Sequence, residues 1–258
     1  MWGIVPAAGR GTRIQPLAFS KELLPVGSRI DGGIERPCAV SEYLVERMIR
    51  GGVRKICFVI SPGKCDIVSY FGANFGEASF AYVVQPRASG LCDAVFRALP
   101  LVARDEPVIL GLPDTIWFPE NALAELPDDV LSFLLFPVAR PELFDAVVLG
   151  EGDVVREIQV KQQDADSRWI WGAIKMPGHV LHDLHALWEA RGRKDEYLGT
   201  LVNAHLGAGG RAVGVKAGHT YVDVGTLHGY RAATQVLAEP GAVTPAHTTD
   251  VMNEGRNR

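Results

Sequence analysis

Two glycines and three cationic side chains lie directly behind the first apolar run of the chain, within the stretch GIVPAAGRGTRIQPLAFSKELLPVG, residues 3–27. The cations are Arg10, Arg13 and Lys21. A loop that contains Gly9 and Gly11 lets backbone N–H groups approach a polyphosphate closely, and cations neutralise the phosphate charge. The combination favours a triphosphate site.

Three other interpretations of this loop compete with a triphosphate site. A dinucleotide-binding fingerprint needs a third glycine where Ile14 stands, and a P-loop needs Gly-Lys-Ser/Thr, which is absent. A plain turn with solvated basic side chains fits a lone Gly-x-Gly. It fits less well the three cations gathered around this one.

The strands and helices expected around the loop predict that it lies at one edge of a β-sheet. Unbroken apolar strands are expected at residues 3–6, 55–61, 80–85 and 107–112, alternating with helices at 40–49, 66–71 and 90–99. Such alternation indicates a parallel sheet covered on both faces, and ligands bind beyond the carboxyl ends of its strands. The glycine loop, Gln85 and Asp114 all follow strand ends, so we expect them at one edge.

From about residue 130 the strand–helix alternation gives way to consecutive strands. Strands at 130–138, 146–149, 154–160 and 168–175, separated by short turns, predict a mixed or antiparallel extension of the sheet. Helices at 177–190 and 196–206, a strand pair at 212–216 and 220–224, and a helix at 226–237 follow. We expect one domain over residues 1–239 and a flexible tail over 240–258, which has little apolar content.

Composition excludes several function classes. The net charge of -4 argues against a general nucleic-acid binder. The four cysteines have no metal or disulfide spacing, so reduced thiols in a cytoplasmic protein are expected. No apolar run approaches the ~20 residues of a membrane span, and a strand at residue 3 leaves no room for a signal peptide.

The stretch GRGTRIQPLAFSKELLPV, residues 9–26, resembles the signature of the sugar-1-phosphate nucleotidyltransferases. It is most similar to the form found in glucose-1-phosphate thymidylyl- and uridylyltransferases, and the resemblance extends to about residue 238. It implies an α/β fold: a Rossmann-like, glycosyltransferase-A-like three-layer sandwich with a mixed-sheet acceptor portion. It also implies that Arg13 and Lys21 are catalytic, and that a nucleoside triphosphate is cradled by Ala8, Gly9, Gly11 and Thr12.

Three further motifs match the same family. In QPRASGLCDAV, residues 85–95, the resemblance implies that Gln85 and Gly90 recognise a pyrimidine edge. In GLPDTIW, residues 111–117, and YVDVGT, residues 221–226, it implies that Asp114 and Asp223 bind Mg²⁺.

The acceptor side departs from the family pattern. Lys161 keeps the place of the lysine that anchors the acceptor phosphate, but Val160 replaces the glutamate expected before it. Asp145 replaces an expected glycine, and Trp171-Gly172 occupies the place of a Thr-Gly pair. These residues predict an acceptor site with altered selectivity for sugar hydroxyls, and they leave the identity of the sugar open.

The resemblance implies Mg²⁺-dependent transfer of a nucleotidyl group from dTTP or UTP to a sugar 1-phosphate, which releases pyrophosphate and forms an NDP-sugar. Its partners would be these two substrates and other copies of the chain in a homo-oligomer, without nucleic acid or membrane. Two alternatives remain: a non-catalytic nucleotide-sugar-binding sensor, and a nucleotidyltransferase for a modified or smaller phosphate acceptor.

Overall fold

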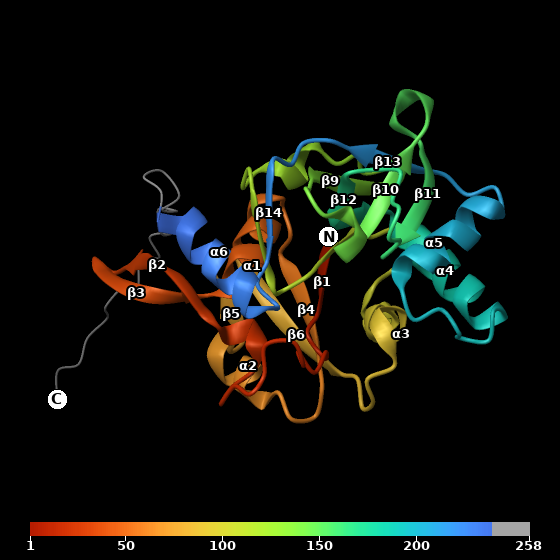
Figure 1. Cartoon of the computed structure of the whole chain (residues 1–258). Coiled ribbons are helices and arrows are strands. Elements are labelled where there is room, and N and C mark those ends of the chain that lie inside the picture. Colours follow the sequence, from red (N-terminus) through yellow and green to blue (C-terminus); the bar gives the residue numbers. More distant parts are fainter. Residues whose placement is uncertain (239–258) are drawn as a thin grey trace.

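Four parallel strands form the centre of a ten-stranded sheet in the computed structural model, which describes residues 1–238 (Figure 1). In spatial order they are β7 (Val108–Gly111), β1 (Trp2–Pro6), β4 (Lys55–Ile60) and β6 (Ala78–Val84). The apolar side chains of β7, β1 and β4 are buried on both faces, as the unbroken hydrophobic runs predict, whereas most of those of β6 are only partly buried. The carboxyl ends of these strands therefore share one edge.

The sheet continues beyond β7 with mixed strands, as expected. β12 (Trp169–Met176) pairs antiparallel with β7 and also contacts β10 (Asp145–Leu149), which forms a hairpin with β11 (Val155–Val160). β9 (Leu131–Pro137) pairs with β12 and with β13 (Ala212–Val215). At the opposite end, the short β5 (Asn74–Phe75) pairs with β6.

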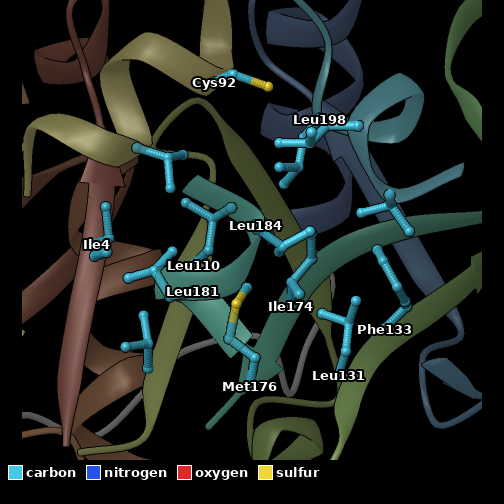
Figure 2. Close-up of a cluster of buried hydrophobic side chains, with 14 of the residues drawn as sticks. Ile4, Cys92, Leu110, Leu131, Phe133, Ile174, Met176, Leu181, Leu184 and Leu198 are labelled. Carbon is cyan, nitrogen blue, oxygen red and sulfur yellow. The ribbon is translucent and has the colours of Figure 1, made fainter. Parts of the chain in front are cut away.

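Helices cover both faces of the sheet, so the three-layer α/β sandwich is confirmed. α1 (Val40–Arg50) and α2 (Cys65–Phe71) contribute to one apolar core. A second core receives side chains from α3 (Gly90–Arg97), α4 (Gly178–Ala190) and α5 (Leu198–Gly207). Figure 2 shows Cys92, Leu181, Leu184 and Leu198 of these three helices gathered around Ile4, Leu110 and Ile174 of the sheet.

Helix α1 illustrates how the local sequence sets an element. Val40, Leu44 and Met48 recur at helical spacing and are at most 1% exposed. The Glu42 carboxylate accepts the Ala39 N–H at 2.9 Å, which caps the first turn. The helix ends before Gly51, as the glycine pair at 51–52 predicts.

The structure corrects the expected strand pairing after residue 212. β13 and β14 (Thr220–Asp223) do not pair with each other. Instead β13 adds to β9, and β14 pairs antiparallel with β8 (Thr115–Phe118), a strand that the sequence pattern did not predict. Proximity in sequence favours a hairpin, but β8 lies directly behind Asp114 and offers β14 an apolar partner that local spacing cannot reveal.

A hairpin between the glycine loop and α1 was also missed. β2 (Pro25–Asp31) and β3 (Ile34–Ala39) form a separate two-stranded sheet joined at Gly32-Gly33, and prolines and charges hide its alternation in the sequence. The last helix, α6 (Leu227–Ala238), packs against β2 (Figure 1). Short 3₁₀ helices span Lys21–Leu23, Leu99–Leu101, Ala122–Glu125, Pro141–Leu143 and Glu151–Asp153.

The predicted tail, residues 240–258, lies outside the described residues. Within residues 1–238, no helix has the length and apolar character needed to cross a membrane.

Candidate active site

The glycine loop leaves the carboxyl end of β1 and returns at Lys21 with a conformation that requires glycine at one position. Gly11 has a φ of +64°, and a Cβ there would lie 2.6 Å from the Lys21 side chain. The Ser20 backbone N–H and hydroxyl donate to the Asp66 carboxylate of α2 at 2.6 and 2.7 Å. Gly11 therefore packs against the Lys21 side chain, and Ser20, the residue before Lys21, fastens the end of the loop to α2.

Four charged side chains implied by the motifs meet at this point. The Lys21 ammonium forms an ion pair with Asp114, and Arg13 Nη1 lies 3.1 Å from Asp223 Oδ2. The β8–β14 pairing sets Asp223 opposite Thr115, the residue after Asp114. A Cβ placed on Gly225 would lie 2.8 Å from Asp223 Oδ1 and 3.2 Å from Asp114 Oδ2, so both carboxylates face the same small volume.

The Lys21–Asp114 pair is kept ionised by its surroundings. Burial alone would lower the pKa of Lys21, but the charges of Asp114, Glu22 and Asp223 raise it overall. Burial alone would raise the pKa of Asp114, but the charge and hydrogen bond of Lys21 lower it overall. A cation and an anion are therefore both present at neutral pH.

Two charged residues of this cluster were missed by the motif analysis. Glu22 is 1% exposed, and Lys64 Nζ contacts its carboxylate oxygens at 2.7 and 2.8 Å. The same ammonium donates to the Ala7 carbonyl at 2.6 Å, which ties the start of the glycine loop to the segment of Lys21. A lysine four residues beyond the end of β4, at the same sheet edge, was the available signal.

A cavity of about 300 Å³ opens beside the first part of the loop. Its lining includes Ala8 and Gly9 from the loop, Gln85 after β6, and Gly90 at the start of α3. Gly90 has a φ of +89°, and a Cβ there would lie 2.8 Å from the Glu196 carbonyl, so only glycine fits. The structure thus brings four predicted nucleotide-binding residues to one cavity, while Thr12 is exposed on the loop.

The predicted acceptor residues gather on β10, β11 and β12. Asp145 lies directly opposite Val160, and a Cβ on Gly199 would contact both side chains. Lys161 follows Val160, is exposed, and places its ammonium 4.6 Å from the centre of the Tyr197 ring. Asp145 and Val160 are partly buried side by side, and Lys161 is the exposed member of the group.

The other two acceptor candidates are packed inside the protein. Trp171 is 6% exposed, and a Cβ on Gly172 would lie 2.5 Å from the Phe136 ring. Burial raises the pKa of Asp145, while a hydrogen bond from Trp171 and the charge of Lys161 act in the opposite direction. Trp171 thus supports the Asp145 carboxyl from the core.

Tyr221 connects the acceptor residues with the ionic cluster. Its ring lies against Phe144 and Phe136, next to Gly172. Burial raises the pKa of Tyr221 well above its ordinary value, and the charges of Asp223, Asp114 and Asp145 add to this shift. The predicted acceptor residues and the ionic cluster therefore lie on either side of the Tyr221 side chain.

The cations of this arrangement, Arg13 and Lys21, lie where they could neutralise a chain of phosphates that extends from the cavity. In the described part of the chain, no group of three or more His, Cys, Asp and Glu side chains forms a protein-only metal cage. Two carboxylates that face one volume are instead suited to a hard cation whose remaining ligands are phosphate oxygens of a substrate.

Comparison with known proteins agrees with this architecture. A sequence model of the family described as nucleotidyl transferase matches residues 2–239. The glucose-1-phosphate thymidylyltransferase of Neisseria meningitidis is 29% identical over 181 residues, which are 66% of this chain and 58% of that protein. The UTP–glucose-1-phosphate uridylyltransferase of Mycoplasma pneumoniae is 26% identical over 146 residues, 47% of each chain. The chain spans about half the length of the curated relatives it matches.

Solved structures give the same fold at low sequence identity. The UTP-bound UGPase from Acinetobacter baumannii superposes with a TM-score of 0.73 at 22% identity, over 93% of this chain and 95% of that one. The family match covers nearly the whole described chain, and it includes the glycine loop and both aspartate motifs. The chain therefore belongs to the nucleotidyl transferase family, and its resemblance to the sugar-1-phosphate nucleotidyltransferases is confirmed.

Proposed function

We propose that this protein transfers a nucleotidyl group from UTP or dTTP to a sugar 1-phosphate, releasing pyrophosphate and forming an NDP-sugar. One observation carries the proposal: the glycine loop joins a base-sized cavity at Gln85 to the paired charges Lys21–Asp114 and Arg13–Asp223. The named activities of the relatives support the same reaction.

Nucleotidyl transfer requires that the two substrates be positioned and that the charge on the phosphates be neutralised. An oxygen of the acceptor phosphate attacks the α-phosphorus in line, one new P–O bond forms, and the bond to the departing pyrophosphate breaks. The attacking phosphate is already ionised, so no general base is required. Arg13 and Lys21 would stabilise the charge that develops on the leaving group, because fixed cations need no reorganisation during the step.

The residues present fit a magnesium ion. Asp114 and Asp223 face one volume and are oxygen donors of the kind that Mg²⁺ combines with substrate phosphates. When bound, Mg²⁺ would supply further charge neutralisation at the triphosphate. Lys21 and Arg13 hold the two carboxylates in place from the side of the loop.

The acceptor proposal centres on Asp145. Val160 lacks the carboxylate that the family places there, but the antiparallel register sets Asp145 directly across from it. The carboxylate oxygens of Asp145 would accept hydrogen bonds from acceptor hydroxyls, and Lys161 would hold the phosphate. The smaller or modified acceptor remains the alternative, because Val160 itself offers no hydrogen-bonding group.

The test is pyrophosphate release with UTP, dTTP, CTP, ATP and GTP against a panel of sugar 1-phosphates. We expect UTP or dTTP with one hexose 1-phosphate to give the highest rate. Arg13→Ala should lower kcat by on the order of a hundredfold, from the loss of ~3 kcal/mol of charge stabilisation. Arg36→Ala removes an exposed arginine of β3 and serves as the matched control. Nucleotide binding without turnover on any acceptor would instead support the sensor alternative.

A further inference from the structure

The side-chain amide of Gln85 has a fixed orientation. Gln85 is 3% exposed, and its Nε2 donates to Asp93 Oδ2 at 2.8 Å and to the Gly90 carbonyl at 3.2 Å. A carboxylate and a carbonyl can only accept hydrogen bonds, so reversing the amide would set oxygen against oxygen twice. The chemistry of the two neighbours therefore assigns nitrogen and oxygen without ambiguity.

This orientation leaves Oε1 as the free atom of the amide. Gln85 Oε1 has no hydrogen-bond partner among the described residues. It is also not among their fully buried polar atoms without a partner, so it keeps some contact with solvent. Gln85 lines the cavity of about 300 Å³, and Oε1 is therefore a hydrogen-bond acceptor open to whatever enters it. The Gly90 N–H begins α3 and has no acceptor within residues 1–238, so it supplies a neighbouring donor.

Asp93 is held in place by its own helix. It is 8% exposed, and Arg97, one turn further along α3, donates to it with Nη2 at 2.9 Å and with Nε at 3.3 Å. Asp93 Oδ2 is thus shared between the Arg97 guanidinium and the Gln85 amide. Arg97 therefore fixes the position of the Asp93 carboxylate, and Asp93 in turn fixes the orientation of the Gln85 amide at the cavity.

We propose that Asp93 is a positioning residue that makes the base site select uracil or thymine over cytosine. Uracil and thymine present a donor at N3 beside the O4 carbonyl, which complements an Oε1 acceptor beside a backbone N–H. Cytosine presents an acceptor at N3 beside an amino group, so both contacts would be mismatched and two polar groups would be buried unpaired. The inference rests on the proposed function, since it requires a nucleobase in this cavity.

The test compares kcat/KM for UTP, CTP and N3-methyl-UTP, with pyrophosphate release as the readout and the best acceptor at saturation. In the unmodified protein, CTP and N3-methyl-UTP should both be worse than UTP by roughly tenfold to a hundredfold or more, because each lacks the N3 donor. Turnover of N3-methyl-UTP within about twofold of UTP would overturn the proposal, and this measurement does not depend on any variant folding.

The variant Asp93→Asn removes the acceptor-only group while keeping its shape. An asparagine can present either oxygen or nitrogen to Gln85, so only the Gly90 carbonyl still opposes reversal of the amide. The UTP-to-CTP ratio should therefore fall, by up to about tenfold. Asp183→Asn makes the same chemical change at an exposed aspartate of α4 that pairs with Arg104, and it should leave the ratio unchanged.

The two proposals fail in different ways. If the unmodified protein releases no pyrophosphate from UTP or dTTP with any acceptor, the proposed function is wrong. If it turns over UTP but Asp93→Asn keeps the original UTP-to-CTP ratio, only the role of Asp93 is wrong. A general structural effect of Asp93 would lower both rates together and leave their ratio unchanged, which would also count against the proposal.

Discussion

At the scale of single residues, Gly9 and Gly11 have different physical reasons to be glycine. Gly11 is required by the fold, because it has a positive φ and its α-carbon lies against Lys21. A Cβ on Gly9 would meet no protein atom within 4 Å, and Gly9 lines the cavity. The space beside Gly9 is therefore available to a ligand, which is where a phosphate cradle would lie.

Gly9→Ala should accordingly lower activity without lowering stability. We expect kcat/KM for the nucleotide to fall on the order of a hundredfold, because a methyl group displaces the phosphates from the backbone N–H groups. The melting temperature should stay within ~2 °C of the unmodified protein, since no protein atom is displaced. Gly11→Ala is the comparison and should lose stability as well as activity. A Gly9→Ala protein with unchanged kinetics would show that phosphates do not pass this point.

At the scale of elements, the β10–β11 register decides which side chains the proposed acceptor would meet. Direct cross-strand partners project from the same face of a sheet, so Asp145 and Val160 present their side chains to one patch. A carboxylate supplied from either strand would reach the same acceptor. The pair is therefore a natural site for an exchange experiment.

Asp145→Gly should lower kcat/KM for the sugar 1-phosphate about tenfold, the value of one lost hydrogen bond to a charged group, and leave KM for the nucleotide unchanged. Adding Val160→Glu to that variant returns a carboxylate from the opposite strand and should recover much of the loss. Steady-state kinetics with each substrate varied in turn provide the measurement. An Asp145→Gly enzyme with undiminished acceptor kinetics would remove Asp145 from the site.

The contact between α2 and the 3₁₀ turn at Lys21 gives a pH dependence. Partial burial would raise the pKa of Asp66, but the hydrogen bonds from Ser20 and from the Ile67 N–H lower it overall. A folded-state pKa below the unfolded one means that the stabilisation is fully present above the unfolded value. It is lost as the pH falls through the folded value, which lies below 3.8.

The free energy of unfolding of Asp66→Asn, measured by urea denaturation, should therefore be lower than that of the unmodified protein at pH 7. The difference should shrink as the pH falls below about 3.8, because both proteins then carry a neutral side chain. A difference that is constant from pH 7 to pH 3 would contradict the ionic origin of this contact.

At the scale of the whole molecule, two distant segments complete the ionic cluster. Arg13 and Asp223 are 210 positions apart in sequence, yet their side chains pair because β14 adds to β8 beside the end of β7. The glycine loop, which leaves the carboxyl end of β1, thereby contacts β14, the last strand of the described residues. A metal-bound nucleotide at this point would link the first and last parts of the chain.

Ligand binding should therefore raise the melting temperature, and magnesium should increase the effect. At a ligand concentration of 100 times Kd the gain is about 2.7 kcal/mol, or ~5–10 °C for a protein of this size. We expect UTP with Mg²⁺ to give this shift and UTP with EDTA to give a smaller one. Asp114→Asn and Asp223→Asn should abolish the difference between the two conditions. Asp31→Asn, at an exposed ion pair of β2, is the control and should preserve it.

The sequence by itself determined the central parallel sheet and the edge that carries the chemistry. Unbroken apolar strands alternating with helices permit few arrangements, so the glycine loop, Gln85 and Asp114 had to follow strand ends at one edge. The resemblance to the family then supplied Asp223 and the acceptor residues from their motifs. The missed strands were β2, β3, β5 and β8. The exposed hairpin of β2 and β3 has no apolar run, and β5 and β8 are too short to show a strand pattern.

Only the tertiary structure decided which side chains touch. Lys64 contacts Glu22, the Gln85 amide donates to Asp93, and Asp145 lies across from Val160, and the sequence pattern predicts none of these contacts. Strand register and helix docking are fixed by how segments far apart in sequence bury their apolar faces together. A polar contact between such segments is a consequence of that packing, and it becomes visible only when the packing is known.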